Sequence, residues 1–129
     1  MEKKVKTILI VEDDLNLNNA IKTLFDESGF HTLTARSIGE ARTQMDRNAV
    51  DIIWLDHYLL GAETGLDFVT YLKGNERLKT IPIYVVSNTA SPDKKAAYLR
   101  LGVEKFYTKV EHSLGETIQE IAQFLEKNE

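Results

Sequence analysis

The segment from Val50 to Asp56 constrains the fold more than any other part of this 129-residue sequence. It is rich in β-branched and other apolar residues, and it ends on the carboxylate of Asp56. A short apolar run of this kind predicts a strand buried on both faces, as in a parallel sheet covered by helices. Ligands of open α/β sheets bind at the carboxyl ends of the strands, so we expect Asp56 to lie at the functional edge.

Four further strand-like runs alternate with helical patterns along the chain. The predicted strands are residues 7–11, 30–35, 81–86 and 103–108, and the helical patterns begin near Leu17, Ser37, Gly65, Ser91 and Ser113. A regular alternation of this kind requires right-handed crossovers between parallel strands. The sequence therefore predicts one doubly wound, flavodoxin-like α/β domain over residues 1–129, with a five-stranded parallel sheet and five helices on both faces.

Composition excludes several classes of protein. The chain has no cysteine, which excludes disulfides and zinc–thiolate sites. Its net charge of −4 and the lack of a basic stripe argue against direct contact with nucleic acid. The charged residues 1–6 do not form a signal peptide, and no apolar run approaches the ~20 residues that a membrane span needs. We therefore expect a cytoplasmic protein without membrane contact.

Reactive side chains follow four of the predicted strands, and they are Glu12, Asp13, Asp56, Ser87 and Lys109. In one sheet these side chains would meet at one edge. Three clustered carboxylates repel one another, and Mg²⁺, a hard cation that prefers oxygen ligands, would offset the repulsion. A hydroxyl and an ammonium group opposite the metal would bind the oxygens of a phosphoryl group. In this arrangement Asp56 is the nucleophile that accepts the phosphoryl group.

These residues, in this order and at this spacing, resemble the response regulator receiver domains of two-component signalling, the CheY-like family. The resemblance covers about Val5 to Lys127 and implies the strand order 2-1-3-4-5. It also implies a phosphoacceptor signalling domain rather than an enzyme with a separate substrate, because phosphotransfer and autodephosphorylation both occur on its own aspartate. The implied phosphoryl donor is a sensor histidine kinase or a phosphotransfer protein.

The resemblance further assigns metal contacts to individual residues. It implies that Asp13 and Asp56 bind Mg²⁺ directly. Glu12 would act largely through water, and the backbone carbonyl of Tyr58 would contact the metal.

The same resemblance implies a phosphate-binding role for Lys109 and a switch made of Ser87 and Phe106. On phosphorylation the Ser87 hydroxyl would move toward the phosphoryl group, and Phe106 would turn into the space that it leaves. The face formed by the helix over residues 92–101, the strand through Phe106 and the helix from Ser113 would then bind a downstream partner protein or a second copy of the chain.

Three positions depart from the usual family pattern. Leu60 and Val110 stand where the family has proline, and Asn88 stands where it has a small residue. A non-proline cis bond costs about 3 kcal/mol, so we expect a trans bond before Val110. The departures affect loops and rates and remove none of the charged groups.

Other protein classes explain the pattern less well. A pseudo-receiver that only binds proteins has no need of all five reactive positions. A hydrolase of the haloacid dehalogenase kind requires a second aspartate where Tyr58 stands. A flavodoxin-like cofactor carrier requires a phosphate-binding loop where the acidic residues 12–14 would repel phosphate.

Several other residues have simpler interpretations. We expect Asp14 to cap a helix and Trp54 to pack in the core. We expect His57, next to Asp56, to be a solvated loop residue, and His31 and His112 to lie on the surface.

Overall fold

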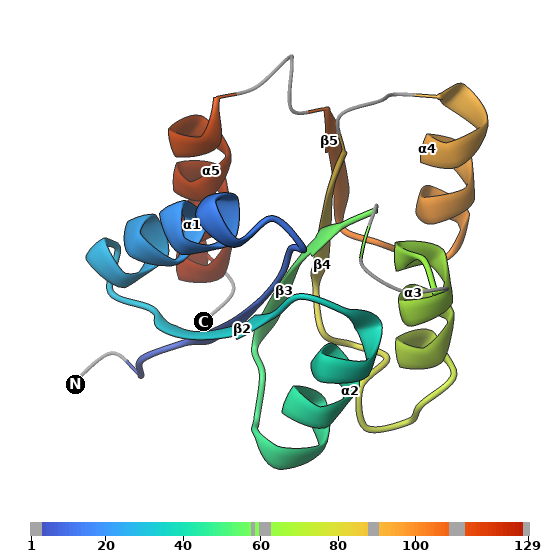
Figure 1. The fold of residues 1–129 in the computed structure, drawn as a ribbon, viewed down its shortest axis with the longest axis horizontal. Coiled ribbons are helices and arrows are strands. Elements are labelled where there is room, and N and C mark those ends of the chain that lie inside the picture. The colour runs from blue at the N-terminus through green and yellow to red at the C-terminus, as the bar shows by residue number, and fades with distance from the viewer. Residues whose placement is uncertain (1–3, 58, 60–62, 88–90, 109–112, 128–129) are drawn as a thin grey trace.

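The computed structural model describes residues 4–57, 59, 63–87, 91–108 and 113–127. Figure 1 shows a twisted parallel sheet with helices on both sides. The strands are β1 (Thr7–Val11), β2 (His31–Ala35), β3 (Ile52–Asp56), β4 (Ile83–Ser87) and β5 (Lys105–Thr108). The helices are α1 (Leu15–Glu27), α2 (Ile38–Arg47), α3 (Gly65–Lys73), α4 (Pro92–Arg100) and α5 (Leu114–Lys127).

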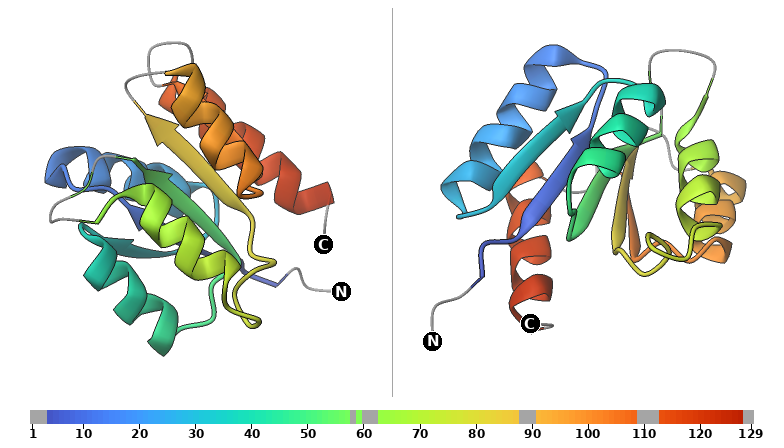
Figure 2. Two further views of the ribbon diagram at one scale, coloured as in Figure 1. Left: turned by 90° about the vertical axis from the view of Figure 1, so that its right-hand side faces the viewer. Right: turned by 90° about the horizontal axis from the view of Figure 1, so that it is seen from below.

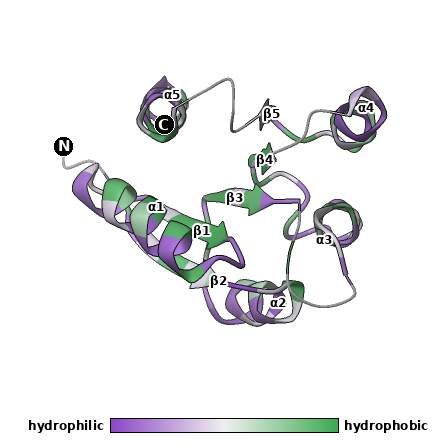
Figure 3. Ribbon diagram, turned by 45° about the horizontal axis from the view of Figure 1, so that its top comes forward, coloured by the Kyte–Doolittle hydropathy of each residue, from purple (hydrophilic) through white to green (hydrophobic). Residues whose placement is uncertain are grey.

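The sheet has the order β2-β1-β3-β4-β5 with all pairs parallel, so the predicted topology is confirmed. The central strands β3 and β4 are buried along their whole length. Figure 3 shows strands β1, β3 and β4 as mostly hydrophobic ribbons between helices that have both polar and apolar stretches. This is the pattern expected of a parallel sheet that is covered on both faces.

Helices α1 and α5 cover one face of the sheet, and α2, α3 and α4 cover the other (Figures 1 and 2). Alternate residues of each strand therefore enter two separate cores. Trp54 packs with Phe25 on the α1–α5 side, with ring centroids 5.9 Å apart. Leu55 and Phe106 lie in the core on the α2–α3–α4 side.

Local signals explain where most helices begin and end. Side chains at the N-caps of α1, α2, α4 and α5 accept main-chain hydrogen bonds, and these residues are Asp14, Ser37, Ser91 and Ser113. Pro92 occupies the first turn of α4, where its missing N–H costs no hydrogen bond. Gly29 and Gly102 follow α1 and α4 with positive φ angles of 91° and 90°, which glycine adopts without strain.

Four of the predicted strands begin later in the structure than the sequence indicates: β2 at His31, β3 at Ile52, β4 at Ile83 and β5 at Lys105. β4 starts at Ile83, after Pro82, which has no N–H to donate to a neighbouring strand. β5 starts at Lys105, after Val103 and Glu104, which belong to the connection between α4 and the strand. Among the described residues, no helix is both long and apolar enough to cross a membrane.

Candidate functional site

Three carboxylates converge at the carboxyl edge of the sheet. Glu12 and Asp13 directly follow β1, and Asp56 is the last residue of β3, the strand that pairs with β1. One ligand oxygen from each residue lies within 4.8 Å of the other two. Glu12 is 1% exposed and Asp56 is 5% exposed, so two of the three charges are almost completely removed from solvent.

Hydrogen bonds to the neighbouring segments hold the acidic loop in place. The main-chain N–H of Glu12 donates to the carbonyl of Ala35 at 3.0 Å. Asn18, a buried residue of α1, donates from Nδ2 to the carbonyls of Glu12 at 2.9 Å and Ala35 at 3.3 Å. Arg36 donates from Nε to the carbonyl of Asp13 at 3.0 Å. Our sequence analysis missed Asn18 and Arg36, which fix the main chain that carries two of the three carboxylates.

The donor set fits a hard divalent cation. All three side chains offer carboxylate oxygens, and among the described residues no sulfur or nitrogen ligand belongs to the cluster. Such a set favours Mg²⁺ over softer metals. A cation at this position would also offset the mutual repulsion of three carboxylates held in a poorly solvated site.

Ser87 lies at the same edge, on the strand next to Asp56. It is the last residue of β4 and is fully buried, and its neighbour Val86 pairs with Asp56. Lys109 directly follows Thr108, which pairs with Ser87, but Lys109 itself lies outside the described residues. Tyr58 and the departures at Leu60, Asn88 and Val110 lie outside them as well, so their expected roles remain predictions.

The expectation that His57 is solvated is wrong. His57 is 7% exposed, and its Nδ1 lies 2.5 Å from the hydroxyl of Tyr98 on α4. Burial, together with the positive charge of Lys94, lowers the pKa of His57 below its ordinary value of 6.5. The imidazole is therefore neutral at pH 7 and acts as a hydrogen-bonding core residue. His31 is exposed, as we expected, and His112 lies outside the described residues.

Phe106 is already largely buried in this structure. Its side chain is 7% exposed, and its ring centroid lies 5.7 Å from that of Tyr98. A switch at this position would therefore change the packing of Phe106 against α4, rather than carry the ring from solvent into the core.

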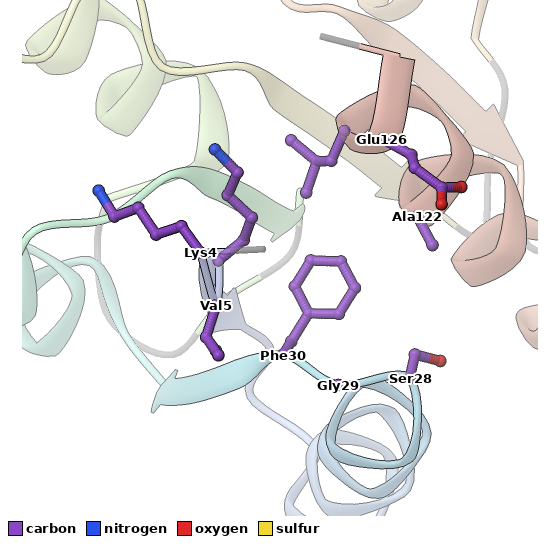
Figure 4. Close-up of a pocket in the computed structure, with 9 residues that line it drawn as sticks. Lys4, Val5, Ser28, Gly29, Phe30, Ala122 and Glu126 are labelled. Atoms are coloured by element: carbon purple, nitrogen blue, oxygen red, sulfur yellow. The ribbon is translucent and has the colours of Figure 1, made fainter. Parts of the chain in front are cut away.

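A separate pocket of about 260 Å³ lies at the opposite, amino-terminal edge of the sheet (Figure 4). It is lined by the segment before β1, the turn before β2 and the last turns of α5. Lys4 and Glu126 stand on its two sides, and Phe30 forms part of its apolar wall. None of the predicted site residues that the structure describes contributes to it.

Comparison with known proteins agrees with this geometry. The model of the response regulator receiver domain family matches residues 8–122. The chain is 29% identical to the phosphate regulon transcriptional regulatory protein PhoB of Pseudomonas aeruginosa over 104 residues, which are 81% of this chain and 45% of PhoB. It thus spans about half the length of this curated relative.

Solved structures have the same fold. A response regulator receiver protein from Pseudomonas putida superimposes with a TM-score of 0.85 at 22% identity, covering 95% of this chain and 99% of that one. The Mn²⁺-bound form of response regulator Rcp1 superimposes with a TM-score of 0.81 at 24% identity, covering 93% and 94%. The family model extends over nearly all of the sequence and includes Glu12, Asp13, Asp56 and Ser87. The chain therefore belongs to the family of response regulator receiver domains.

Proposed function

We propose that this receiver domain accepts a phosphoryl group on Asp56 from a sensor histidine kinase or a phosphotransfer protein, with Mg²⁺ as the required cofactor. The observation that carries the proposal is the convergence of Glu12, Asp13 and Asp56 within 4.8 Å at the carboxyl edge of the sheet. Rcp1, a response regulator of the same fold, has been solved in a Mn²⁺-bound form, which supports the binding of a divalent cation by a protein of this fold.

Asp56 is the nucleophile in this proposal. One of its carboxylate oxygens attacks the phosphorus, the bond from phosphorus to the donor breaks with its electron pair, and an acyl phosphate forms on Asp56. Attack by water on the same phosphorus later returns the carboxylate and releases inorganic phosphate. Bound Mg²⁺ would supply positive charge for the phosphoryl oxygens. Glu12 and Asp13 would hold it, together with Asp56 and the backbone carbonyl of Tyr58.

Two further residues would bind the phosphoryl oxygens. Ser87 is the last residue of the strand beside Asp56 and is fully buried, so it would contribute its hydroxyl from the same edge of the sheet. Lys109 follows β5, the next strand, and would contribute an ammonium group. Both groups donate hydrogen bonds where charge develops on the transferred group, which is the main way that proteins accelerate phosphoryl transfer.

The signal would leave through the surface made by α4, β5 and α5. β5 lies at one edge of the sheet, where among the described residues its one partner strand is β4, and α4 and α5 lie on opposite sides of it (Figure 1). On this surface Glu120 of α5 accepts a hydrogen bond from the Tyr107 hydroxyl and pairs with Lys105. We propose that a downstream protein or a second copy of the chain binds here after Ser87 and Phe106 have rearranged.

The direct test is intact-mass spectrometry after incubation with acetyl phosphate and MgCl₂. We expect the mass of one phosphoryl group to be added to the wild-type protein and none to Asp56→Asn. Asp51→Asn is the matched control, because Asp51 belongs to the same segment but hydrogen-bonds Thr7 at the other end of the strand. It should be labelled like the wild type.

Labelling that persists in Asp56→Asn, or that proceeds equally in EDTA, would contradict the proposal. Absence of labelling in the wild type under conditions where another receiver domain is labelled would favour the alternative function, a pseudo-receiver that binds its partners independently of phosphorylation.

A further inference from the structure

Three buried side chains connect the phosphoacceptor segment to the proposed signalling surface. His57 directly follows Asp56, and its Nδ1 lies 2.5 Å from the Tyr98 hydroxyl, with the two rings perpendicular at a centroid distance of 5.6 Å. Tyr98 is fully buried and packs against Phe106 on its other side. The contacts therefore run without a break from the residue after Asp56, through α4, to β5.

The fold accommodates the Tyr98 hydroxyl at one specific place. Gly65, the first residue of α3, donates its N–H to the carbonyl of His57 at 3.2 Å. A Cβ on Gly65 would overlap the Tyr98 hydroxyl and would stand 3.3 Å from the carbonyl oxygen of Asp56. The hydroxyl thus reaches the His57 imidazole only because position 65 has no side chain.

Tyr98 is also fixed from the side of the sheet. Its carbonyl accepts main-chain hydrogen bonds from Leu101 at 3.1 Å and from Val103 at 3.4 Å, in the turn that leads into β5. The Tyr98 ring contacts Phe106 and the Tyr98 main chain holds the end of α4, so a shift of the whole residue would reach both.

We propose that the His57–Tyr98 hydrogen bond is a positioning contact that stabilises the resting arrangement of α4 and Phe106 and breaks when a phosphoryl group occupies Asp56. The inference rests on the proposed function, because it concerns the same site. The bond joins two buried side chains, so any arrangement of α4 that lacks it must compete against the contribution of the bond. Occupancy of Asp56 and release of Tyr98 are then thermodynamically linked, and the linkage is reciprocal.

Because the linkage is reciprocal, the direction in which Tyr98→Phe changes the affinity for a ligand at Asp56 is defined. The substitution keeps the ring that packs on Phe106 and removes only the hydroxyl. It should destabilise the resting state more than the occupied state, and so tighten the binding of beryllofluoride with Mg²⁺, a noncovalent analogue of the phosphoryl group. The expected change is about fivefold, the ratio that corresponds to one buried neutral hydrogen bond.

The experiment is a titration of ¹⁵N-labelled protein with beryllofluoride and MgCl₂, followed by amide resonances. The resonances of amides near Asp56 report binding, and those of α4 and Phe106 report structural change at the surface made by α4, β5 and α5. In the wild type, the ¹⁵Nδ1 resonance of His57 should also shift on binding as the bond breaks. In Tyr98→Phe without ligand, the chemical shifts of the α4 amides should be closer to those of the beryllofluoride-bound protein.

Three further variants separate the loss of this hydrogen bond from a general loss of stability. Tyr71→Phe removes the hydroxyl of a partly buried tyrosine on α3 that packs against Phe68 and should titrate like the wild type. His57→Leu and the double variant with Tyr98→Phe complete a cycle in which both single changes and the double change should tighten binding by a similar factor.

The possible failures are distinct. If the wild type binds no beryllofluoride, the proposed function fails, and this inference fails with it. If the wild type binds but Tyr98→Phe has the same affinity and the same α4 resonances, the inference alone fails. Weaker binding by Tyr98→Phe would also overturn it, because the bond would then favour the occupied state.

Discussion

The side chain of Asn18 donates a hydrogen bond to the main-chain carbonyl of Glu12, from the first turns of α1 to the loop that carries the acidic cluster. The same Nδ2 also lies 3.3 Å from the carbonyl of Ala35 at the end of β2. One buried amide thus joins β1, β2 and α1 beside the three clustered carboxylates. The geometry of the acidic site therefore depends on a residue that is not itself one of the proposed metal ligands.

We predict that Asn18→Ala lowers the free energy of unfolding by about 1–3 kcal/mol, because the buried carbonyl of Glu12 loses its donor. It should also weaken Mg²⁺ binding severalfold, since the loop becomes less ordered. Asn19→Ala changes the exposed neighbour on the same helix and should alter neither property. Urea denaturation and a Mg²⁺ titration measure the two effects, and equal stability of the two variants would contradict the role of Asn18.

The crowding of carboxylates predicts opposite effects of Asp13→Asn on stability and on metal binding. Without metal, the loss of one clustered charge should raise the free energy of unfolding by on the order of 1 kcal/mol. With metal, the loss of a direct ligand should weaken Mg²⁺ binding at least tenfold, or ~1.4 kcal/mol. Asp14→Asn is the control, because Asn also caps helices and Asp14 lies outside the cluster. Thermal melts in EDTA in which Asp13→Asn is less stable than the wild type would exclude the repulsion.

The sequence predicts most of the fold because local patterns and burial agree. Strands β1 and β3 are apolar runs buried on both faces, and a run of this kind has few alternatives in a chain with regular helical segments between its strands. The acidic cluster follows from topology, because neighbouring parallel strands end at the same edge. Its prediction required only that Glu12, Asp13 and Asp56 lie at strand ends.

The environment of His57 could not be predicted in the same way. Its burial depends on Tyr98, which is 41 positions away in sequence and reaches it only because α4 packs beside α3. Asn18 was recognisable in principle. It shares the buried face of α1 with Ile21 and Phe25, and a polar residue at such a position requires hydrogen-bond partners.

The lowered pKa of His57 predicts that the folded protein loses stability in acid. The folded state disfavours protonation, so the unfolded state binds more protons once the pH falls through 6.5, the ordinary value. Stability should therefore decrease from this pH downward, until the pH also passes the lower pKa of the folded state.

His57→Asn should lack this contribution, whereas His31→Asn, a change of an exposed histidine, should retain it. The check is urea denaturation in EDTA between about pH 7.5 and about pH 5. If the free energy of unfolding depends on pH in the same way for the wild type and His57→Asn, then the pKa of His57 does not change on folding.

The absence of a side chain at Gly65 leads to the last prediction. A methyl group there would overlap the Tyr98 hydroxyl and would stand 3.3 Å from both the Asp56 carbonyl oxygen and the His57 Cα. Main-chain atoms cannot move aside as a flexible side chain can, so Gly65→Ala should lower the free energy of unfolding by about 1–3 kcal/mol through overpacking.

Gly39→Ala is the matched control. Gly39 also lies in the first turn of a helix, and an added Cβ would meet only the Ser37 Oγ at 3.8 Å. This change should stabilise the protein by up to about 1 kcal/mol, because alanine favours helix more than glycine does. Denaturation of both variants tests the contrast, and a Gly65→Ala protein as stable as Gly39→Ala would show that the junction between α3 and α4 tolerates a side chain. Combining Gly65→Ala with Tyr98→Phe should recover part of the loss, because the overlapping hydroxyl is then absent.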